Sequence, residues 1–187
     1  YASGSTIFLS VAAGISIDAY ENILGKGASI VRAMPNTPAA IGQGITALIG
    51  NDATGADDLQ LCQDLLGAIG QTVRLETESQ MDAVTGVSGS GPAYVFFMVD
   101  ALASAGQAQG LPEELAMQLA KATVAGAGSL AAQSHETPEQ LRINVTSPNG
   151  TTQAGLEVLM DPKDGLAPLL SATVAKATDR SRELSSG

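Results

Sequence analysis

The sequence has no tryptophan, one cysteine and one histidine among its 187 residues, with only three phenylalanines and three tyrosines. A hydrophobic core must therefore be built from Ala, Val, Leu, Ile and Met, whose small side chains suit closely packed helices. Cys62 alone cannot form an internal disulfide or a site of several thiolates, which fits a reducing cytoplasm. His135 is a single imidazole, so no metal site can be assembled from histidines.

Positive charge is also scarce, because 9 Lys and Arg stand against 19 Asp and Glu, giving a formal net charge of −10. Such a chain offers no basic surface for a phosphate backbone and is repelled by anionic membranes, so nucleic acid and membrane are not expected as partners. No apolar run reaches the ~20 residues of a membrane span. The apolar stretch at residues 7–17 is not expected to be a signal peptide, because no Lys or Arg stands between Tyr1 and Lys26.

The first 76 residues alternate strand and helix patterns. Residues 6–12 (TIFLSVA) lack a polar face, which predicts a strand buried on both sides in a parallel sheet. Further strands are predicted at residues 29–34, 45–49 and 72–75, and helices at residues 16–24 and 56–69. Alternating strands and helices predict an α/β domain at residues 1–76.

From residue 77 onward, apolar residues recur at helical spacing almost to the end, which predicts an all-α domain at residues 77–187. Capping patterns predict helix starts at Thr77 and Thr137, and Gly110 is expected to end a helix that begins near Pro92. The central helix carries closely spaced small residues that allow tight helix packing: Ala122, Ala125, Gly126 and Gly128. This favours an interlocked helical bundle that self-associates.

The polar segment at residues 144–152 (NVTSPNGTT) lies between two predicted helices. Backbone amides of Gly150, Thr151 and Thr152 would begin the second helix with hydroxyl groups beside them, which makes an anion site suited to a carboxylate. An ordinary turn between helices with threonine capping explains the same pattern, and the pattern alone leaves both interpretations open.

Four segments resemble those of pyrroline-5-carboxylate reductases, in the family's order and at its spacing: residues 10–17 (SVAAGISI), 32–39 (RAMPNTPA), 82–96 (DAVTGVSGSGPAYVF) and 141–159 (LRINVTSPNGTTQAGLEVL). The resemblance extends over essentially the whole chain. It implies that the α/β part is the last portion of a dinucleotide-binding Rossmann domain, followed by a helical dimerisation and substrate-binding domain. The family's strand, glycine-rich turn and helix for the pyrophosphate have no counterpart here.

The resemblance also implies a reaction, the transfer of a hydride from NADPH or NADH to the C=N bond of 1-pyrroline-5-carboxylate, which gives L-proline. Thr152 is the expected catalytic residue, and the substrate-binding residues are Ser147, Gly150, Thr151 and Thr152. The residues expected at the nicotinamide are Ala12, Ala13, Gly14, Met34, Asn36, Thr37 and Asn144. Asn149 stands where many members have glycine, and it tolerates the left-handed backbone that the turn needs.

Two alternatives to this function remain. The chain could be a helical assembly module without catalysis, and we expect the 187 residues alone not to bind a dinucleotide tightly, because nothing holds the pyrophosphate. It could also be a hydroxyisobutyrate-type dehydrogenase, which usually needs a catalytic lysine on its helical domain. Lys121 is the only lysine of the central helix, and it lies away from the polar loop in sequence. Gly42 to Ala47 matches a dinucleotide motif by letter only, because residues 45–49 are expected to be a strand.

Overall fold

The computed structural model describes residues 6–185 and contains two compact units. Unit 1 comprises the residues up to Pro92 and those from Thr173 onward, and unit 2 comprises Ala93–Ala172. The last strand of the described residues ends at Arg74, and helices follow it. The domain boundary predicted between residues 76 and 77 stays a prediction, because the compact units divide at Pro92 and at Thr173. Unit 1 therefore includes helices from the start and from the end of residues 77–187, which the sequence predicts to be one helical domain.

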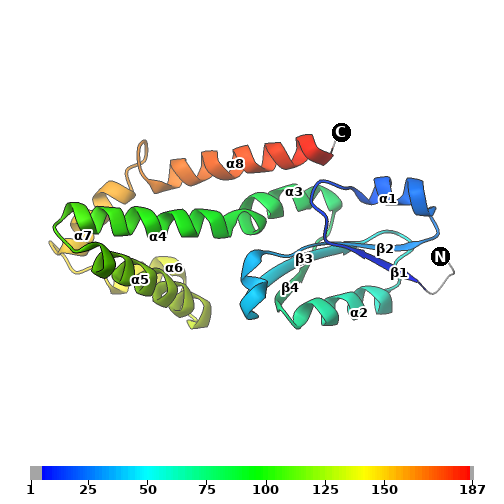
Figure 1. The fold of residues 1–187 in the computed structure, drawn as a ribbon, viewed down its shortest axis with the longest axis horizontal. Helices are drawn as coiled ribbons and strands as arrows, with labels where there is room; N and C mark the ends of the chain where they lie inside the picture. Colours follow the sequence, from blue (N-terminus) through cyan, green and yellow to red (C-terminus); the bar gives the residue numbers. More distant parts are fainter. Residues whose placement is uncertain (1–5, 186–187) are drawn as a thin grey trace. The chain divides into compact units, whose positions relative to one another are not determined.

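Unit 1 contains a mixed four-stranded sheet in the order β1-β2-β3-β4 (Figure 1). The strands are β1 (Ile7–Ser10), β2 (Ser29–Met34), β3 (Gly44–Gly50) and β4 (Gly70–Arg74). β1 pairs with β2 in parallel and β3 with β4 in parallel, whereas β2 and β3 are antiparallel. Residues 35–43 join β2 to β3 and contain the 3-10 helix η1 (Thr37–Ile41). This connection is too short for the crossover that parallel strands need, so β2 and β3 run antiparallel.

The prediction that β1 is buried on both sides was wrong. β1 pairs with β2 alone, and all four of its residues are only half-buried. The apolar run that suggested a central strand therefore belongs, within the described residues, to a strand at the edge of the sheet.

The helices of unit 1 begin and end at the signals that the sequence carries. They are α1 (Ile17–Leu24), α2 (Ala56–Gly67), the 3-10 helix η2 (Glu78–Gln80), α3 (Met81–Val84) and the π-helix η3 (Thr85–Gly89). Ser16 Oγ accepts from Ala19 N at 3.2 Å and caps α1, and Gly25 ends it with a φ of 90°. At η2, Gln80 Oε1 accepts from Thr77 N at 3.2 Å, which confirms the predicted capping box.

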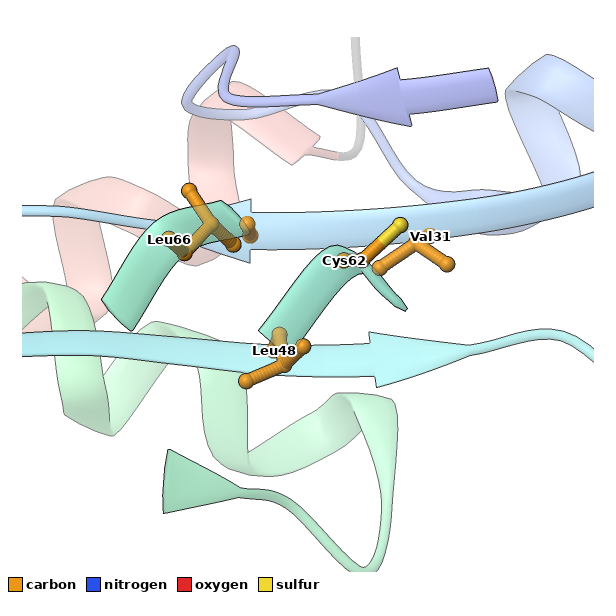
Figure 2. Packing of buried hydrophobic residues seen from close by; sticks show 5 residues of the cluster. Val31, Leu48, Cys62 and Leu66 are labelled. Atoms are coloured by element: carbon orange, nitrogen blue, oxygen red, sulfur yellow. The ribbon is translucent and has the colours of Figure 1, made fainter. Parts of the chain in front are cut away.

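The core of unit 1 lies between the sheet and α2, where the buried cluster consists of Val31, Ala33, Leu48, Cys62 and Leu66. Figure 2 shows the side chains of the helix directed toward those of β2 and β3. Val31 and Leu48 are fully buried. Alternate residues of β2 point to opposite sheet faces, so Ile30, Arg32 and Met34 belong to the other face.

The end of α8 (Leu166–Ser185) packs on α3 and η3 within unit 1. Ser181 Oγ lies 2.7 Å from Asp82 Oδ1, with Ser181 donating to the carboxylate. A Cβ atom at Gly86 would overlap the hydroxyl oxygen of Thr178, so glycine is required for this close approach. Thr178 and Ser181 are both buried.

Unit 2 consists of helices: α4 (Gly91–Ala108) from Ala93, α5 (Glu113–Gln133), α6 (Pro138–Asn144), α7 (Thr151–Leu159) and the first part of α8. Thr137 Oγ1 accepts from Gln140 N at 3.2 Å and caps α6 as predicted, but the Gln140 side chain bonds Asn144 and does not close a capping box. The buried cluster of this unit is small, formed by Ala103, Ala116 and Ala120 with Val99 and Met117 packed against it.

Unit 2 also leaves large apolar side chains exposed. Phe96 is 62% exposed and Phe97 is 73% exposed. On α5, Cβ atoms added at Gly126 and Gly128 would meet no atom within 4 Å. No helix in residues 6–185 combines the length and the apolar character that crossing a membrane requires.

Candidate functional site

The loop between α6 and α7 forms a tight turn over residues 147–150. Gly150 N donates to Ser147 O at 3.0 Å, and Asn149 has a φ of 58°, the left-handed conformation that the sequence predicts for it. Proline at the second position of the turn and a left-handed residue at the third are typical of a type II turn. A Cβ atom at Gly150 would overlap Ser147 Oγ, so this position requires glycine.

α7 begins directly after this turn with an open N-terminus. Gly150 is the N-cap residue and supplies no side-chain acceptor. Within the described residues, the first backbone bond of the helix runs from Ala154 N to Gly150 O at 3.2 Å, and the amides of Thr151 and Thr152 have no recorded acceptor. Unpaired amides at the positive end of a helix bind an anion. The turn thus places Ser147, Gly150, Thr151 and Thr152 together, as the sequence predicts.

Asn144, at the end of α6, has both parts of its amide engaged. Asn144 Nδ2 donates to Glu136 Oε2 at 3.0 Å, and its Oδ1 accepts from Gln140 Nε2 at 2.8 Å. All three side chains are exposed. Each part of the amide keeps one further donor or lone pair, so a cofactor could contact Asn144 without breaking either bond. No sequence pattern pointed to Glu136, which precedes α6 and whose carboxylate accepts from the last residue of that helix.

Beside the loop, a groove of about 410 Å³ lies between α6 and α7. Arg142, Thr146 and Gln153 line it, but none of the predicted substrate-binding residues does. At its end, Asp161 Oδ1 accepts from Lys163 N and Asp164 N at 2.8 Å each. The hydrogen bond from Asp164 and then that from Lys163 lower the pKa of Asp161 from its usual value.

A second group of predicted residues lies in unit 1, where β1 and β2 end. Because these strands are parallel, the loops that follow Ser10 and Met34 meet at one edge of the sheet. Ser10 Oγ accepts from Ala12 N at 3.2 Å and lies 2.5 Å from the Tyr20 hydroxyl oxygen. Gly14 has a φ of 75°, and a Cβ atom there would lie 3.1 Å from Leu184 Cβ. Ala12, Ala13 and Gly14 thus form a turn that is fixed by local bonds and by α8.

In the loop after β2, two of the three predicted cofactor residues have side chains engaged within the protein. The side chain of Met34 is buried, and a Cβ atom at Gly89 would lie 3.9 Å from its sulfur. Asn36 Oδ1 accepts from Ile45 N at 2.9 Å, and Asn36 Nδ2 donates to Ser88 O at 3.2 Å. Thr37 is exposed at the start of η1, so it is the predicted residue of this loop whose side chain is open to a ligand.

Sequence reasoning missed Glu78, whose side chain reaches the region where β1 and β2 end. Glu78 Oε1 accepts from Ile17 N at 2.8 Å and from Arg32 Nη1 at 2.7 Å. The predicted capping box placed Glu78 in the first turn of a helix, but no pattern pointed to a partner so far away in the sequence.

The predicted residues thus form two groups, one in each compact unit, and each group is assembled by its own local structure. The dinucleotide-like letters at Gly42 to Ala47 lie mainly in β3, which confirms that they form no nucleotide turn. Among residues 6–185, no group of three or more His, Cys, Asp or Glu side chains could hold a metal ion.

Comparison with known proteins gives consistent matches. Residues 78–184 match the family model described as pyrroline-5-carboxylate reductase dimerisation. The chain is 44% identical to pyrroline-5-carboxylate reductase from Pisum sativum over 96% of its length, and 41% identical to the one from Pseudomonas aeruginosa over 95%. The chain spans 64% of the length of each of these relatives.

Solved structures agree with these sequence matches. A pyrroline-5-carboxylate reductase from Coxiella burnetii superposes with a TM-score of 0.91 at 37% identity, covering 96% of this chain and 66% of that chain. The Plasmodium falciparum pyrroline carboxylate reductase, solved with NADP bound, gives 0.86 at 30% identity and covers 97% of this chain and 68% of that chain. The family match over more than half the chain and the extended identity together show that this chain belongs to the pyrroline-5-carboxylate reductase family.

Proposed function

We propose that the protein containing this chain reduces the C=N bond of 1-pyrroline-5-carboxylate to give L-proline. The observation that carries the proposal is the open N-terminus of α7, where the amides of Thr151 and Thr152 have no recorded acceptor in the described part of the chain. The substrate has one carboxylate, and this helix end supplies the donors that a carboxylate needs.

The residues of the loop between α6 and α7 have two different roles, binding of the carboxylate and contact with the imine nitrogen. The amides of Gly150 to Thr152 and the Ser147 hydroxyl hold the carboxylate, which fixes the position of the ring. The Thr152 hydroxyl donates a hydrogen bond to the imine nitrogen, which takes up a proton as the hydride adds to the carbon of the C=N bond. Positioning of this kind lowers the barrier because it removes the entropy cost of bringing the reacting atoms together.

The hydride would come from a reduced nicotinamide dinucleotide, either NADPH or NADH. The fit of unit 1 to this group rests on the turn at Gly14, which has a φ of 75° and in which Ala13 is exposed, and on the exposed Thr37 in the loop after β2. Asn144 is also proposed to contact the nicotinamide side of the cofactor. The NADP found in the Plasmodium falciparum protein supports a dinucleotide of this class.

We also propose that the protein forms a homo-oligomer through the helices of unit 2. Only alanines are buried in the core cluster of this unit, while Phe96 and Phe97 are mostly exposed, so a second copy is the natural cover for them. Open space at Gly126 leaves room for a partner helix to approach α5 closely.

The single, buried Cys62 supports a cytoplasmic location.

The deciding experiment is an assay of the complete polypeptide that contains these residues. Purified protein is supplied with 1-pyrroline-5-carboxylate and NADPH or NADH, and L-proline formation and coenzyme oxidation are measured together. Turnover with either coenzyme supports the proposal, and dinucleotide binding without proline formation refutes it. Oxidation of a hydroxyisobutyrate with NAD would favour the alternative dehydrogenase, although Lys121 lines a different groove with Gln107 and Glu113.

Self-association is tested separately by light scattering over micromolar concentrations. Replacing Gly126 by Leu should weaken the oligomer by ~1–3 kcal/mol, because the added side chain fills the space that a partner needs. Replacing Gly67 by Leu is the matched control, since that glycine lies on α2 of unit 1 and also has nothing within 4 Å of its Cβ position. A monomer mass for the unaltered protein would refute the oligomer.

A further inference from the structure

Glu78 stands at the start of the helical part, directly after the sheet. The capping box formed by Thr77 and Gln80 fixes η2. The backbone of this short helix therefore sets the direction of the Glu78 side chain. One oxygen of Glu78 accepts two hydrogen bonds, from the main chain of Ile17 and from the side chain of Arg32. This carboxylate therefore joins three segments that are distant in sequence.

The bond to Ile17 lies at the N-terminus of α1. Ile17 is the first residue of that helix, and its amide is one of those that a helix leaves unpaired. A carboxylate there also meets the positive end of the helix dipole. Residues 11–16 connect β1 to this point, so the turn of Ala12, Ala13 and Gly14 is held by Ser10 at one end and by Glu78 at the other.

The bond to Arg32 reaches the middle of the sheet. Arg32 lies on β2 with 3% exposure, and its Nε and Nη2 atoms are buried without an acceptor among the described residues. Glu78 is its only recorded ion-pair partner in that part of the chain. A buried guanidinium without its carboxylate would draw in water or move, and two residues later β2 ends at Met34.

We propose that Glu78 is a positioning residue, whose carboxylate sets the two loops at the carboxyl ends of β1 and β2 in the arrangement that the dinucleotide binds. This proposal rests on the proposed function, because those two loops are where the dinucleotide is placed. Glu78 acts through Ile17 and Arg32 and does not itself touch the coenzyme.

The test uses the complete polypeptide with the substitutions Glu78→Ala and Glu78→Gln. Calorimetric titration with NADPH and NADH gives the dissociation constant, and steady-state assays at saturating coenzyme give kcat. Glu78→Ala should raise the dissociation constant about tenfold and change kcat less than about threefold, because the loops bind the coenzyme and the hydride transfer follows once it is bound. Glu78→Gln keeps an acceptor oxygen without the charge, so it should raise the constant only about threefold.

Two control variants separate positioning from loss of stability. Glu76→Ala removes an exposed carboxylate two residues away and should leave the dissociation constant unchanged. Leu66→Ala destabilises unit 1 in the core cluster between α2 and the sheet, which includes no residue of either loop, so it should lower the melting temperature and leave coenzyme affinity intact. If Glu78→Ala does not fold, Glu78→Gln decides.

Hydrogen exchange gives a readout that does not require coenzyme. Residues 11–24 and 35–45 should exchange faster in Glu78→Ala than in Leu66→Ala. Unchanged exchange and unchanged affinity in both Glu78 variants would overturn the proposal, as would an equal loss of affinity in Leu66→Ala. If the unaltered protein binds neither coenzyme, the proposed function fails, while the exchange rates still show whether Glu78 sets the loops.

Discussion

Gly86 lies directly against Thr178, so that a Cβ atom added to the glycine would overlap the hydroxyl oxygen and lie 3.1 Å from the Val174 carbonyl oxygen. Gly86→Ala should therefore lower the free energy of unfolding by ~1–3 kcal/mol, because α8 must move away from η3. Urea denaturation measures the change. Gly67→Ala is the matched control, since it should stabilise α2 slightly through helix propensity, and equal stability of the two variants would contradict the contact.

The left-handed Asn149 predicts opposite outcomes for two substitutions. Its φ of 58° costs a β-branched residue ~1–2 kcal/mol, so Asn149→Val should lower the free energy of unfolding by about that amount, whereas Asn149→Gly should change it by less than ~1 kcal/mol. The side chain is exposed, so little packing is lost in either variant. Thermal denaturation of both variants checks this, and equal effects would show that the turn adopts another conformation.

Thr152 carries the proposed contact with the imine nitrogen. Thr152→Val keeps the shape of the side chain but removes the hydroxyl, so kcat/KM for the complete enzyme should fall by roughly 10–100-fold, as expected when one hydrogen bond of ~1.5–3 kcal/mol is lost. Thr152→Ser retains a hydroxyl and should keep most of the activity. Unchanged kinetics in Thr152→Val would remove this residue from the mechanism.

Cys62 should react slowly while the protein is folded. Burial, and then the nearby negative charge of Asp58, raise the pKa of its thiol. Alkylation by iodoacetamide, followed by mass spectrometry, should need a higher pH in the folded chain than in urea. Equal rates in both states would contradict the burial.

The same shift makes stability depend on pH. The folded state favours the neutral thiol, so its contribution is complete below the thiol's usual pKa of about 8.5 and is lost as pH rises through the higher folded value. The melting temperature should therefore fall more between pH about 8 and about 10 than it does in Cys62→Ala. An identical pH dependence in that variant would remove Cys62 as the cause.

Local structure could be predicted well because its signals are local. Residues 29–34 form a strand as predicted, since an apolar run is stopped by Pro35. Ser16 and Gly25 mark the ends of α1, and the turn at Asn149 follows from proline and glycine on either side of it. The residues proposed to bind the substrate lie within one such local segment, so the turn that holds them could be predicted, while their role stays a prediction.

Long-range partners could not be predicted in the same way. Arg32 lies in a predicted strand and Glu78 in a predicted helix start. Nothing in the sequence of either segment indicates that the two side chains form an ion pair. The Asn36 amide likewise forms hydrogen bonds with Ile45 and Ser88, and these depend on where the tertiary fold places both residues. The half-burial of β1 shows the limit of an apolar run as a signal, because the run predicts burial without indicating how many neighbours the strand has.

The reversal of direction between β2 and β3 has a consequence for the order of folding. The pairing of Met34 with Ala47 closes a shorter stretch of chain than the pairing of Ser10 with Arg32 or of Gly44 with Gly70. Shorter loops lose less entropy on closure, so we expect β2 and β3 to meet before the parallel pairs form. Glu78 lies 46 residues from Arg32 in the sequence, so this ion pair closes a longer stretch of chain than any strand pair and would neutralise the positive charge of Arg32 after the sheet has assembled.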